Sequence, residues 1–268
     1  MTTLQALVLG IVQGITEFLP ISSSGHLVLL ERIWHIQGSG LLFVTLLHVG
    51  TLAAVLFAMK DDVMTLLRNP FSWTGRMILV ALIPTAIVGA VFEEFFEHLF
   101  QNPVTVGFEF VITGVVLWWI DTITTGHKEL EDVKPTDALW IGTLQGAAII
   151  PALSRSGLTI AAGLWRGLDR DTAGRFSFLL SIPAIIGATL VQLDDVFEAP
   201  RQALGGLTAT TAIVGTLAAL VAGYIAVKWT LWLIKRAKMR YFAIYVWALA
   251  LFVFFDQLFY HHWFPPLW

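Results

Sequence analysis

The sequence contains no cysteine and little charge, and both features narrow the class of protein. Without cysteine among its 268 residues, the chain can form neither a disulfide framework nor a thiolate metal site. Charged residues make up 13% of the chain, against about 25% in ordinary soluble domains. Hydrophobic residues make up 57%, which predicts an integral membrane protein. The N-terminal MTTLQALVLG lacks a basic region, so we do not expect a cleaved signal peptide.

Two stretches place polar residues inside apolar sequence. They are QGITEFLPISSSGH (residues 13–26) and QGAAIIPALSRSGLT (residues 145–159), and the second repeats the first 132 positions later. Five identical pairs share this offset: Gln13 and Gln145, Gly14 and Gly146, Ser22 and Ser154, Ser24 and Ser156, and Gly25 and Gly157. The chain therefore contains an internal repeat, and we expect a site between its copies.

The apolar segments predict an all-α membrane fold. The halves around each polar stretch are shorter than the roughly 20 residues that span a bilayer. Each stretch is therefore expected to form a re-entrant helix pair, tolerated where protein or water satisfies the broken backbone. Residues 60–76 are expected to form a polar loop. Six longer segments are expected to span the membrane: residues 41–59, 77–92, 104–120, 176–193, 207–227 and 242–259.

The odd number of spans in each copy predicts the symmetry of the repeat. A re-entrant pair returns to its starting side, whereas three spans end on the opposite side, so the second copy is expected to be inverted. Inverted repeats with broken helices are a known membrane architecture in which the breaks mark the binding site. We expect residues 1–120 to form the first repeat, 121–137 a cytoplasmic loop, and 138–268 the second repeat.

The distribution of basic residues predicts the orientation. The side of the N-terminus receives only Arg32 and Arg201, while the other side receives thirteen basic residues and is therefore expected to be cytoplasmic. Both termini, and the entrance to the first re-entrant pair, are then outside the cell, in a multi-pass protein of the plasma membrane. The thirteen are Lys60, Arg68, Arg76, Lys128, Lys134, Arg166, Arg170, Arg175, Lys228, Lys235, Arg236, Lys238 and Arg240.

Arg155 lies in the second polar stretch, between Ser154 and Ser156. An arginine at membrane depth is costly and is expected to face a cavity or a partner. One alternative is a structural ion pair with Glu17 across the repeat. We favour an anion site, because a guanidinium binds phosphate bidentately and hydroxyl groups surround it.

The glycines add a second reason to expect an anion. The return helices are predicted to begin just after Gly25 and Gly157, so both would present positive N-terminal ends to the breaks. Together with one arginine they suit a highly charged anion such as a diphosphate. The Ser-x-Ser-Gly pattern is also typical of helix caps, and capping is expected in either case.

The first stretch supplies candidates for bond breaking. Gln13 and Glu17 are four residues apart and share one helix face. Ser22 or Ser23 lies close in sequence to His26, which can serve as general base, general acid or nucleophile.

Three other polar residues are open to simpler interpretations. For His48, an interhelical hydrogen bond is as good an interpretation as a role in the site. Glu109 and Asp256 are expected near outer helix ends, where solvation explains them.

QGITEFLPISSSGH resembles the first signature of the undecaprenyl-diphosphate phosphatase family of the bacitracin-resistance type, an E/Q-x-x-x-E segment followed by P-x-S-S-S/T-G-H. PALSRSGLT resembles its second, P-G-x-S-R-S-x-x-T. FSFLLSIPAIIGA (residues 176–188) and FAIY (residues 242–245) are also similar, so the likeness covers nearly the whole chain.

The resemblance implies hydrolysis of undecaprenyl diphosphate to the monophosphate, which recycles the lipid carrier for cell-wall synthesis and confers resistance to bacitracin, a competitor for the substrate. A homodimer is compatible with the resemblance. It implies functional roles for Gln13, Glu17, Ser22, Ser23, His26, Ser154, Arg155, Ser156 and Thr159. We assign Glu17, Ser23, His26 and Arg155 to catalysis, and the remaining site residues, with Ser24, Gly25 and Gly157, to substrate binding.

Two positions depart from the family pattern. Gln13 stands where many members have a second Glu, and Ala152 stands where the second signature has Gly. Loss of a carboxylate weakens a site for Mg²⁺ or Ca²⁺ at Glu17, because hard cations prefer carboxylate oxygens, although substrate phosphates can supply ligands. We therefore expect a weak cation requirement, or none.

Other functions were weighed against this one. The acid-phosphatase-like lipid phosphatases also use S-G-H and S-R segments, but they need a histidine where this chain has Ala161, so that class is rejected. A transporter or flippase of an anionic polyprenyl phosphate lipid stays open, because transporters share the inverted-repeat architecture.

Two catalytic mechanisms also stay open. In the first, Ser23 attacks phosphorus, His26 acts as its base and Glu17 orients His26. In the second, His26 attacks or activates water, Glu17 assists, and the serines only bind the phosphate.

Overall fold

The structure is a computed structural model that describes residues 1–36, 40–92, 94–96, 99, 103–123, 126–198 and 207–267. Within these ranges every long element is a helix. In chain order they are α1 (Thr3–Phe18), α2 (Ser23–Ile33), α3 (Leu41–Ala58), α4 (Lys60–Arg68), α5 (Trp73–Val91), α7 (Val106–Ile120), α8 (Pro135–Ala147), α9 (Arg155–Trp165), α10 (Arg170–Glu198), α12 (Ala209–Arg236) and α13 (Arg240–Phe255). Short 3₁₀ turns at Pro103–Thr105 and Leu130–Asp132 and a π-turn at Asp256–Tyr260 complete the list.

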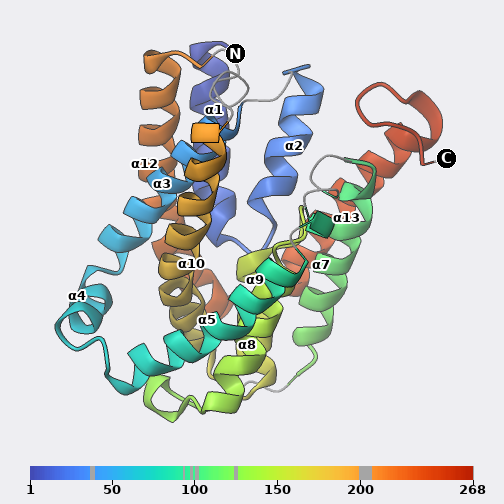
Figure 1. Cartoon of the computed structure of the whole chain (residues 1–268). Coiled ribbons are helices and arrows are strands. Elements are labelled where there is room, and N and C mark those ends of the chain that lie inside the picture. Colours follow the sequence, from blue (N-terminus) through green and yellow to red (C-terminus); the bar gives the residue numbers. More distant parts are fainter. Residues whose placement is uncertain are drawn as a thin grey trace.

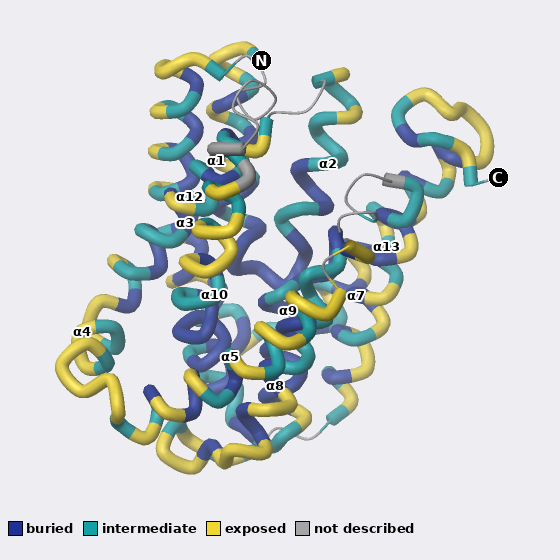
Figure 2. Tube along the Cα trace, viewed as in Figure 1, coloured by how far each residue is buried: buried dark blue, intermediate teal, exposed yellow. Residues whose placement is uncertain are grey.

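Five helices are long and apolar enough to cross a membrane, which confirms an all-α integral membrane protein. They are α3, α5, α10, α12 and α13, the last with its π-turn. Their outward faces carry apolar side chains: Ile213, Leu217, Val221 and Ile225 form a stripe along α12, each more than half exposed. Figure 2 shows exposed segments along the outer helices and buried segments where the helices converge.

Some predicted boundaries differ from the structure. The predicted loop at 60–76 was wrong in part, because Lys60–Arg68 forms α4, whose acidic first turn and basic last turn suit a helix dipole. The predicted span at 104–120 is a helix of only 15 residues, α7. The predicted span at 207–227 ends too early, since α12 continues to Arg236, and the predicted span at 242–259 begins two residues too late, since α13 begins at Arg240. Arg201 lies outside the described residues.

The helices pack in pairs that join distant parts of the chain. α1 packs along α12, which also packs on α3, while α8 packs on α5, α7 on α13, and α3 on α10. In Figure 1 the two chain termini lie in the upper half, and α4 lies at the left edge in the lower half. The close approach of α1 to α12 depends on glycine: a Cβ on Gly14 would lie 2.6 Å from the carbonyl oxygen of Ala219.

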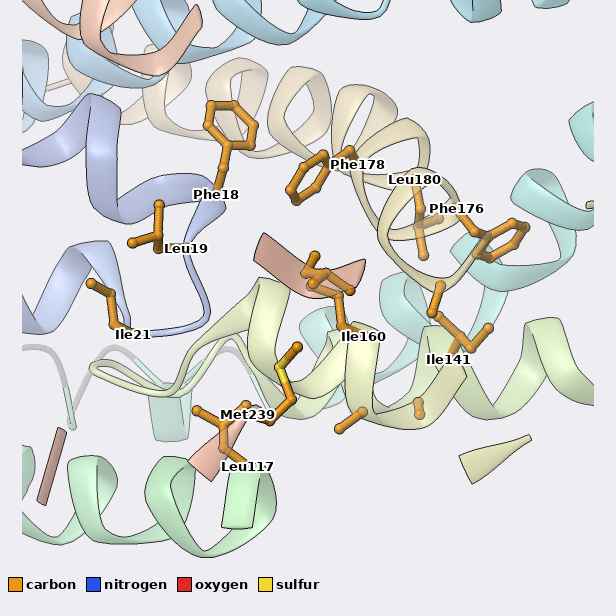
Figure 3. Close-up of a cluster of buried hydrophobic side chains, with 14 of the residues drawn as sticks. Phe18, Leu19, Ile21, Leu117, Ile141, Ile160, Phe176, Phe178, Leu180 and Met239 are labelled. Carbon is orange, nitrogen blue, oxygen red and sulfur yellow. The ribbon is translucent and has the colours of Figure 1, made fainter. Parts of the chain in front are cut away.

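A buried apolar cluster supports the two polar breaks. Phe18 at the end of α1 packs edge to face on Phe178 of α10, with ring centroids 5.4 Å apart. Ile160 of α9 belongs to the same cluster, and Figure 3 shows it among side chains from several helices. Both breaks are therefore anchored to one core.

Ion pairs close the lower end of the fold. Asp137 at the start of α8 is fully buried and binds Lys128 at 2.8 Å and Arg166 at 2.9 Å. Asp121 after α7 accepts hydrogen bonds from the Met239 amide and the Arg240 side chain. Burial alone would raise the pKa of the Asp121 carboxyl, but these bonds and the nearby positive charge lower it below its usual range.

Candidate active site

The first break lies between α1 and α2. α1 ends at Phe18 and α2 begins at Ser23, after the N-cap residue Ser22. Ser22 has φ 70°, in the left-handed region, and its Oγ accepts the Gly25 amide hydrogen at 3.2 Å. Ser22 Oγ also lies 3.3 Å from Ser24 Oγ. The serines thus cap the return helix, as expected for this residue type.

The second break repeats this local geometry. Ser154 caps α9, its Oγ accepts the Gly157 amide hydrogen at 3.0 Å, and it lies 3.3 Å from Ser156 Oγ. Both return helices begin three residues earlier than predicted, at Ser23 and Arg155 rather than after the glycines, because serine is a strong N-cap. The amides of Gly25 and Gly157 therefore bond to their caps, and the positive end of each helix lies at the break.

The two breaks interlock through backbone and hydroxyl groups. Ser24 Oγ accepts the Ala152 amide hydrogen at 3.1 Å, and Ser156 Oγ donates to the Leu19 carbonyl at 2.9 Å. Gly25 lies where the breaks approach closely: a Cβ there would lie 3.0 Å from the Ala152 Cβ and 2.6 Å from the Phe110 ring. One connected site is therefore built from segments 132 residues apart.

Glu17 is the centre of this site. Its Oε1 binds Arg155 Nη2 at 2.7 Å, and its Oε2 accepts a hydrogen bond from Ser23 Oγ at 2.6 Å. Gln13 Nε2 donates to the same oxygen at 2.9 Å, from one turn earlier on α1. His48 Nε2 of α3 lies 3.9 Å from Oε2. Glu17 is only 8% exposed, so its charge is balanced by these neighbours and not by water.

Three polar atoms around Glu17 are buried without a hydrogen-bond partner. They are Arg155 Nη1, Gln13 Oε1 and His48 Nδ1. A buried polar atom without a partner costs free energy, and such atoms are often explained by a bound group. Arg155 Nη1 is a cationic donor, so the site has an unused contact for an anionic oxygen.

His26 occupies the opposite side of the first break. Its Nδ1 lies 2.6 Å from the Ser22 carbonyl oxygen, and its Nε2 lies 2.8 Å from the Tyr245 hydroxyl of α13. Neither ring nitrogen bonds to Ser23 or Glu17. The predicted arrangement in which Glu17 orients His26 as the base of Ser23 is therefore not the one observed: Glu17 itself accepts the Ser23 hydrogen.

Some predicted residues lie away from Glu17. The Thr159 hydroxyl, one turn into α9, lies 2.6 Å from Ser177 Oγ of α10 and joins the two helices. The interpretation of Glu109 and Asp256 as solvated was wrong, because they are 4% and 2% exposed. Asp256 accepts the amide hydrogens of His262, Trp263 and Phe264 and thereby orders the turn after α13.

The donor set does not fit a cation held by protein ligands alone. Both oxygens of Glu17 already accept hydrogen bonds, and the described part of the chain holds no group of three His, Cys, Asp or Glu placed to bind a metal ion. Gln13 Oε1, next to Glu17, is a buried side-chain oxygen without a hydrogen-bond partner. Any Mg²⁺ or Ca²⁺ would therefore take most of its ligands from a phosphate.

Sequence reasoning missed Tyr245 and gave His48 too little weight. Tyr245 was seen only as part of a segment similar to the family, since a tyrosine 219 positions from His26 gives no spacing signal. Thr113 was also missed: its hydroxyl accepts the Ser154 amide hydrogen at 3.3 Å. An additional repeat pair, Gly10 and Gly142, continues the 132-residue offset and was detectable from the sequence.

Comparison of the chain with known proteins supports the family that the two signatures indicate. A family model described as bacitracin resistance protein BacA matches residues 6–252. The chain belongs to this BacA family. A relative from Bacillus thuringiensis (strain Al Hakam), named undecaprenyl-diphosphatase 4, is 46% identical over 253 residues, covering 94% of this chain and 96% of the relative.

Other organisms carry relatives that match this chain over nearly their whole length. One from Carboxydothermus hydrogenoformans, named undecaprenyl-diphosphatase, is 45% identical and covers 93% of this chain and 95% of its own. Another of the same name, from Halothermothrix orenii, is 42% identical and covers 94% and 97%. The likeness thus extends well beyond the two breaks and includes the helices that position them.

Proposed function

We propose that this chain is a membrane phosphatase that hydrolyses undecaprenyl diphosphate to undecaprenyl monophosphate and inorganic phosphate. The names of its BacA relatives support the substrate. The observation that carries the proposal is Glu17, which accepts the Ser23 hydroxyl hydrogen through one oxygen and binds Arg155 through the other. A carboxylate, a hydroxyl and a guanidinium with an unused donor are thereby brought together.

The geometry favours attack by Ser23. In this mechanism Ser23 Oγ forms a bond to the terminal phosphorus, its proton passes to Glu17, and the phosphoanhydride bond breaks to release undecaprenyl monophosphate. Water then displaces the phosphoryl group from Ser23, which regains its proton from Glu17. His26 is proposed to take up a proton from that water at Nε2 through the Tyr245 hydroxyl, which gives its hydrogen to Nε2 as it takes one from the water; the reverse transfer later returns the proton to solvent.

Arg155 and the helix ends bind the charge of the substrate. The Nη1 donor of Arg155 is buried without a partner, and a phosphoryl oxygen at that position would satisfy it. The positive ends of α2 and α9 lie at the same breaks and favour an anion. Such donors act chiefly by stabilising the charge of the transferring phosphoryl group.

We propose further that the two halves form an inverted repeat. The two breaks share the same serine geometry, and α1 packs on α12 as α8 packs on α5. A GxxxG pair lies on each of these first helices: Gly10 and Gly14 on α1, and Gly142 and Gly146 on α8. In this proposal α1–α2 and α8–α9 are re-entrant pairs, and residues 1–120 and 138–268 are the repeats.

The proposed orientation puts both termini and the mouth of the site outside the cell. The positive-inside bias supports it, as does the position of α4 in the lower half of the molecule, away from the termini (Figure 1). Single cysteines at Thr3 and Leu267 should react with an impermeant thiol reagent on intact cells, and one at Glu131 only after lysis. Reaction of Glu131 alone from outside would reverse the orientation.

Phosphate release by the purified protein from undecaprenyl diphosphate tests the function. We expect one phosphate per monophosphate formed, no release by Glu17→Gln, and inhibition by bacitracin, which competes for the substrate. A flippase of polyprenyl phosphate lipids is the second candidate, supported by the packing of broken helices. Lipid translocation in vesicles without phosphate release would favour it over the phosphatase.

A further inference from the structure

We propose that Tyr245 is a further catalytic residue: its hydroxyl holds Nε2 of the His26 imidazole and relays the proton that this nitrogen gains and loses. The inference rests on the proposed role of His26 in the phosphatase reaction. It concerns a residue of α13, a helix that contributes no other contact to the two breaks among the hydrogen bonds described above.

His26 is held on three sides. The Ser22 carbonyl lies 2.6 Å from Nδ1, and the Tyr245 hydroxyl lies 2.8 Å from Nε2. The Tyr245 ring stacks on the imidazole with centroids 5.6 Å apart and an angle of 14° between the planes. Phe110 of α7 packs edge to face from another direction, at 5.8 Å. The ring plane and both nitrogens are therefore fixed.

The Ser22 carbonyl determines the tautomer. A carbonyl oxygen only accepts hydrogen bonds, so Nδ1 carries a hydrogen. In neutral His26 the lone pair is then on Nε2, and Tyr245 donates to it. Because the Tyr245 hydroxyl occupies that lone pair, a proton that His26 takes up at Nε2 comes from the phenol, which takes another from the water, and the reverse transfer releases it.

A phenol is suited to this position because it can both donate and accept. It donates to Nε2 when His26 is neutral and accepts from the Nε2 hydrogen when His26 is protonated. A lysine or an arginine could only donate, and a carboxylate could only accept. Tyr245 can therefore hold the imidazole in the same orientation through a complete proton cycle.

Tyr245 does not contact the groups proposed to bind the diphosphate. Glu17, Arg155 and Ser23 have other partners, so removal of the phenol hydroxyl should slow the chemical step and leave substrate affinity unchanged. Tyr245 is also 44% exposed, on the apolar surface of α13. Tyr245→Phe keeps the stacked ring and removes only the hydroxyl, so it should still fold.

The test combines kinetics with NMR of the full-length protein in nanodiscs, labelled with ¹⁵N-histidine. We expect Tyr245→Phe to lower kcat about tenfold, the effect of one hydrogen bond, with KM within about twofold. The Nε2 resonance of His26, assigned by its loss in His26→Gln, should move toward the position of a free lone pair. Tyr241→Phe is the matched control, a tyrosine one turn earlier that is 62% exposed, and should change neither.

Several results would overturn the proposal. They are a wild-type kcat in Tyr245→Phe, an unmoved Nε2 resonance, or an equal loss in Tyr241→Phe. Should Tyr245→Phe fail to fold, 3-fluorotyrosine at position 245 keeps the shape and makes the phenol a stronger donor. The Nε2 resonance should then move in the opposite direction, and no movement would again reject the idea.

The proposed function fails in a different way. Full phosphatase activity in His26→Gln would remove His26 from the reaction, and Tyr245 would then have no catalytic group to which it could relay a proton. The hydrogen bond seen by NMR would be unaffected by that result. Absence of phosphate release by the wild-type protein would reject the phosphatase itself.

Discussion

Ser23 Oγ lies 2.6 Å from Glu17 Oε2, although one residue begins α2 and the other lies at the end of α1. This hydrogen bond spans the first break and aligns a hydroxyl with a buried carboxylate. Arg155, which binds the other oxygen of that carboxylate, comes from the second break. The carboxylate therefore links the two breaks, and most predictions below concern its neighbours.

Ser23→Ala separates the two mechanisms. If Ser23 attacks phosphorus, the variant should lose about 1,000-fold or more in kcat, and acid quenching of the wild-type protein with labelled substrate should trap phosphoserine. A hydroxyl that only positions phosphate should cost about 10- to 100-fold, the effect of one or two hydrogen bonds to a charged group. A tenth of wild-type turnover in Ser23→Ala, beside an inactive His26→Ala, would transfer the attack to His26.

Arg155→Lys keeps the positive charge but removes the planar guanidinium that can bind two oxygens at once. A lysine can neutralise Glu17 but cannot bind it and a phosphoryl oxygen with two fixed donors. We expect kcat/KM to fall about 100-fold or more, while the variant inserts and melts near the wild-type temperature. Hydrolysis close to the wild-type rate would show that Arg155 serves only as the ion-pair partner of Glu17.

Gln13→Glu should raise the cation dependence. Gln13 Nε2 donates to Glu17 Oε2 at 2.9 Å, so a carboxylate there would place a second negative charge beside the first. Without a divalent cation the variant should be slower than wild type, and Mg²⁺ or Ca²⁺ should restore it. The comparison is phosphate release with and without chelator, and equal chelator sensitivity in both proteins would contradict the prediction.

His48→Ala should lower kcat about tenfold. His48 Nε2 is 3.9 Å from Glu17 Oε2, and the side chain is 27% exposed against 8% for Glu17. The His48 ring is therefore more exposed than Glu17 and lies beside the carboxylate that accepts the Ser23 hydrogen. His127→Ala, at an exposed histidine of the lower loop, is the control. Equal activity in both variants would return His48 to a packing role.

Gly14→Ala should destabilise the fold and lower activity, whereas Gly187→Ala should do neither. A Cβ on Gly14 would lie 2.6 Å from the Ala219 carbonyl oxygen of α12, while a Cβ on Gly187 meets nothing within 4 Å. We expect a cost of about 1–3 kcal/mol at Gly14 from overpacking, and a gain of up to about 1 kcal/mol at Gly187 from helix propensity. Thermal unfolding in detergent measures both; a stable, active Gly14→Ala would argue against close packing of α1.

Much of this site was readable from the sequence because its parts are local. Both breaks, their serine caps and the special position of Arg155 follow from short motifs within apolar sequence. The partners were harder to predict, because they depend on helix packing between distant segments. The sequence offered His26 as a partner for Glu17 through proximity, yet the helical turn after Ser22 directs His26 toward Tyr245 instead.

The same limit applies to burial at the helix ends. The sequence predicted that Glu109 and Asp256 are solvated, because both lie near the end of an apolar segment. A hydropathy pattern gives only this position along the segment and does not show which residues pack around a side chain. The chain after α13 folds back so that three of its amides bond to Asp256. The positions of the long helices were predicted well because length and hydropathy determine them, whereas 15-residue α7 shows that an apolar segment need not have full spanning length.

The glycine contact between α1 and α12 has a consequence for biogenesis. α1 emerges first from the ribosome, but its packing partner begins at Ala209, some 200 residues later. Until then the face of α1 that carries Gly10 and Gly14 has no α12 beside it, and Glu17 lacks its partner until Arg155 has been synthesised. A nascent chain arrested before α12 should therefore expose this face to the insertion machinery, and cross-linkers at Gly14 should capture that machinery until α12 replaces it.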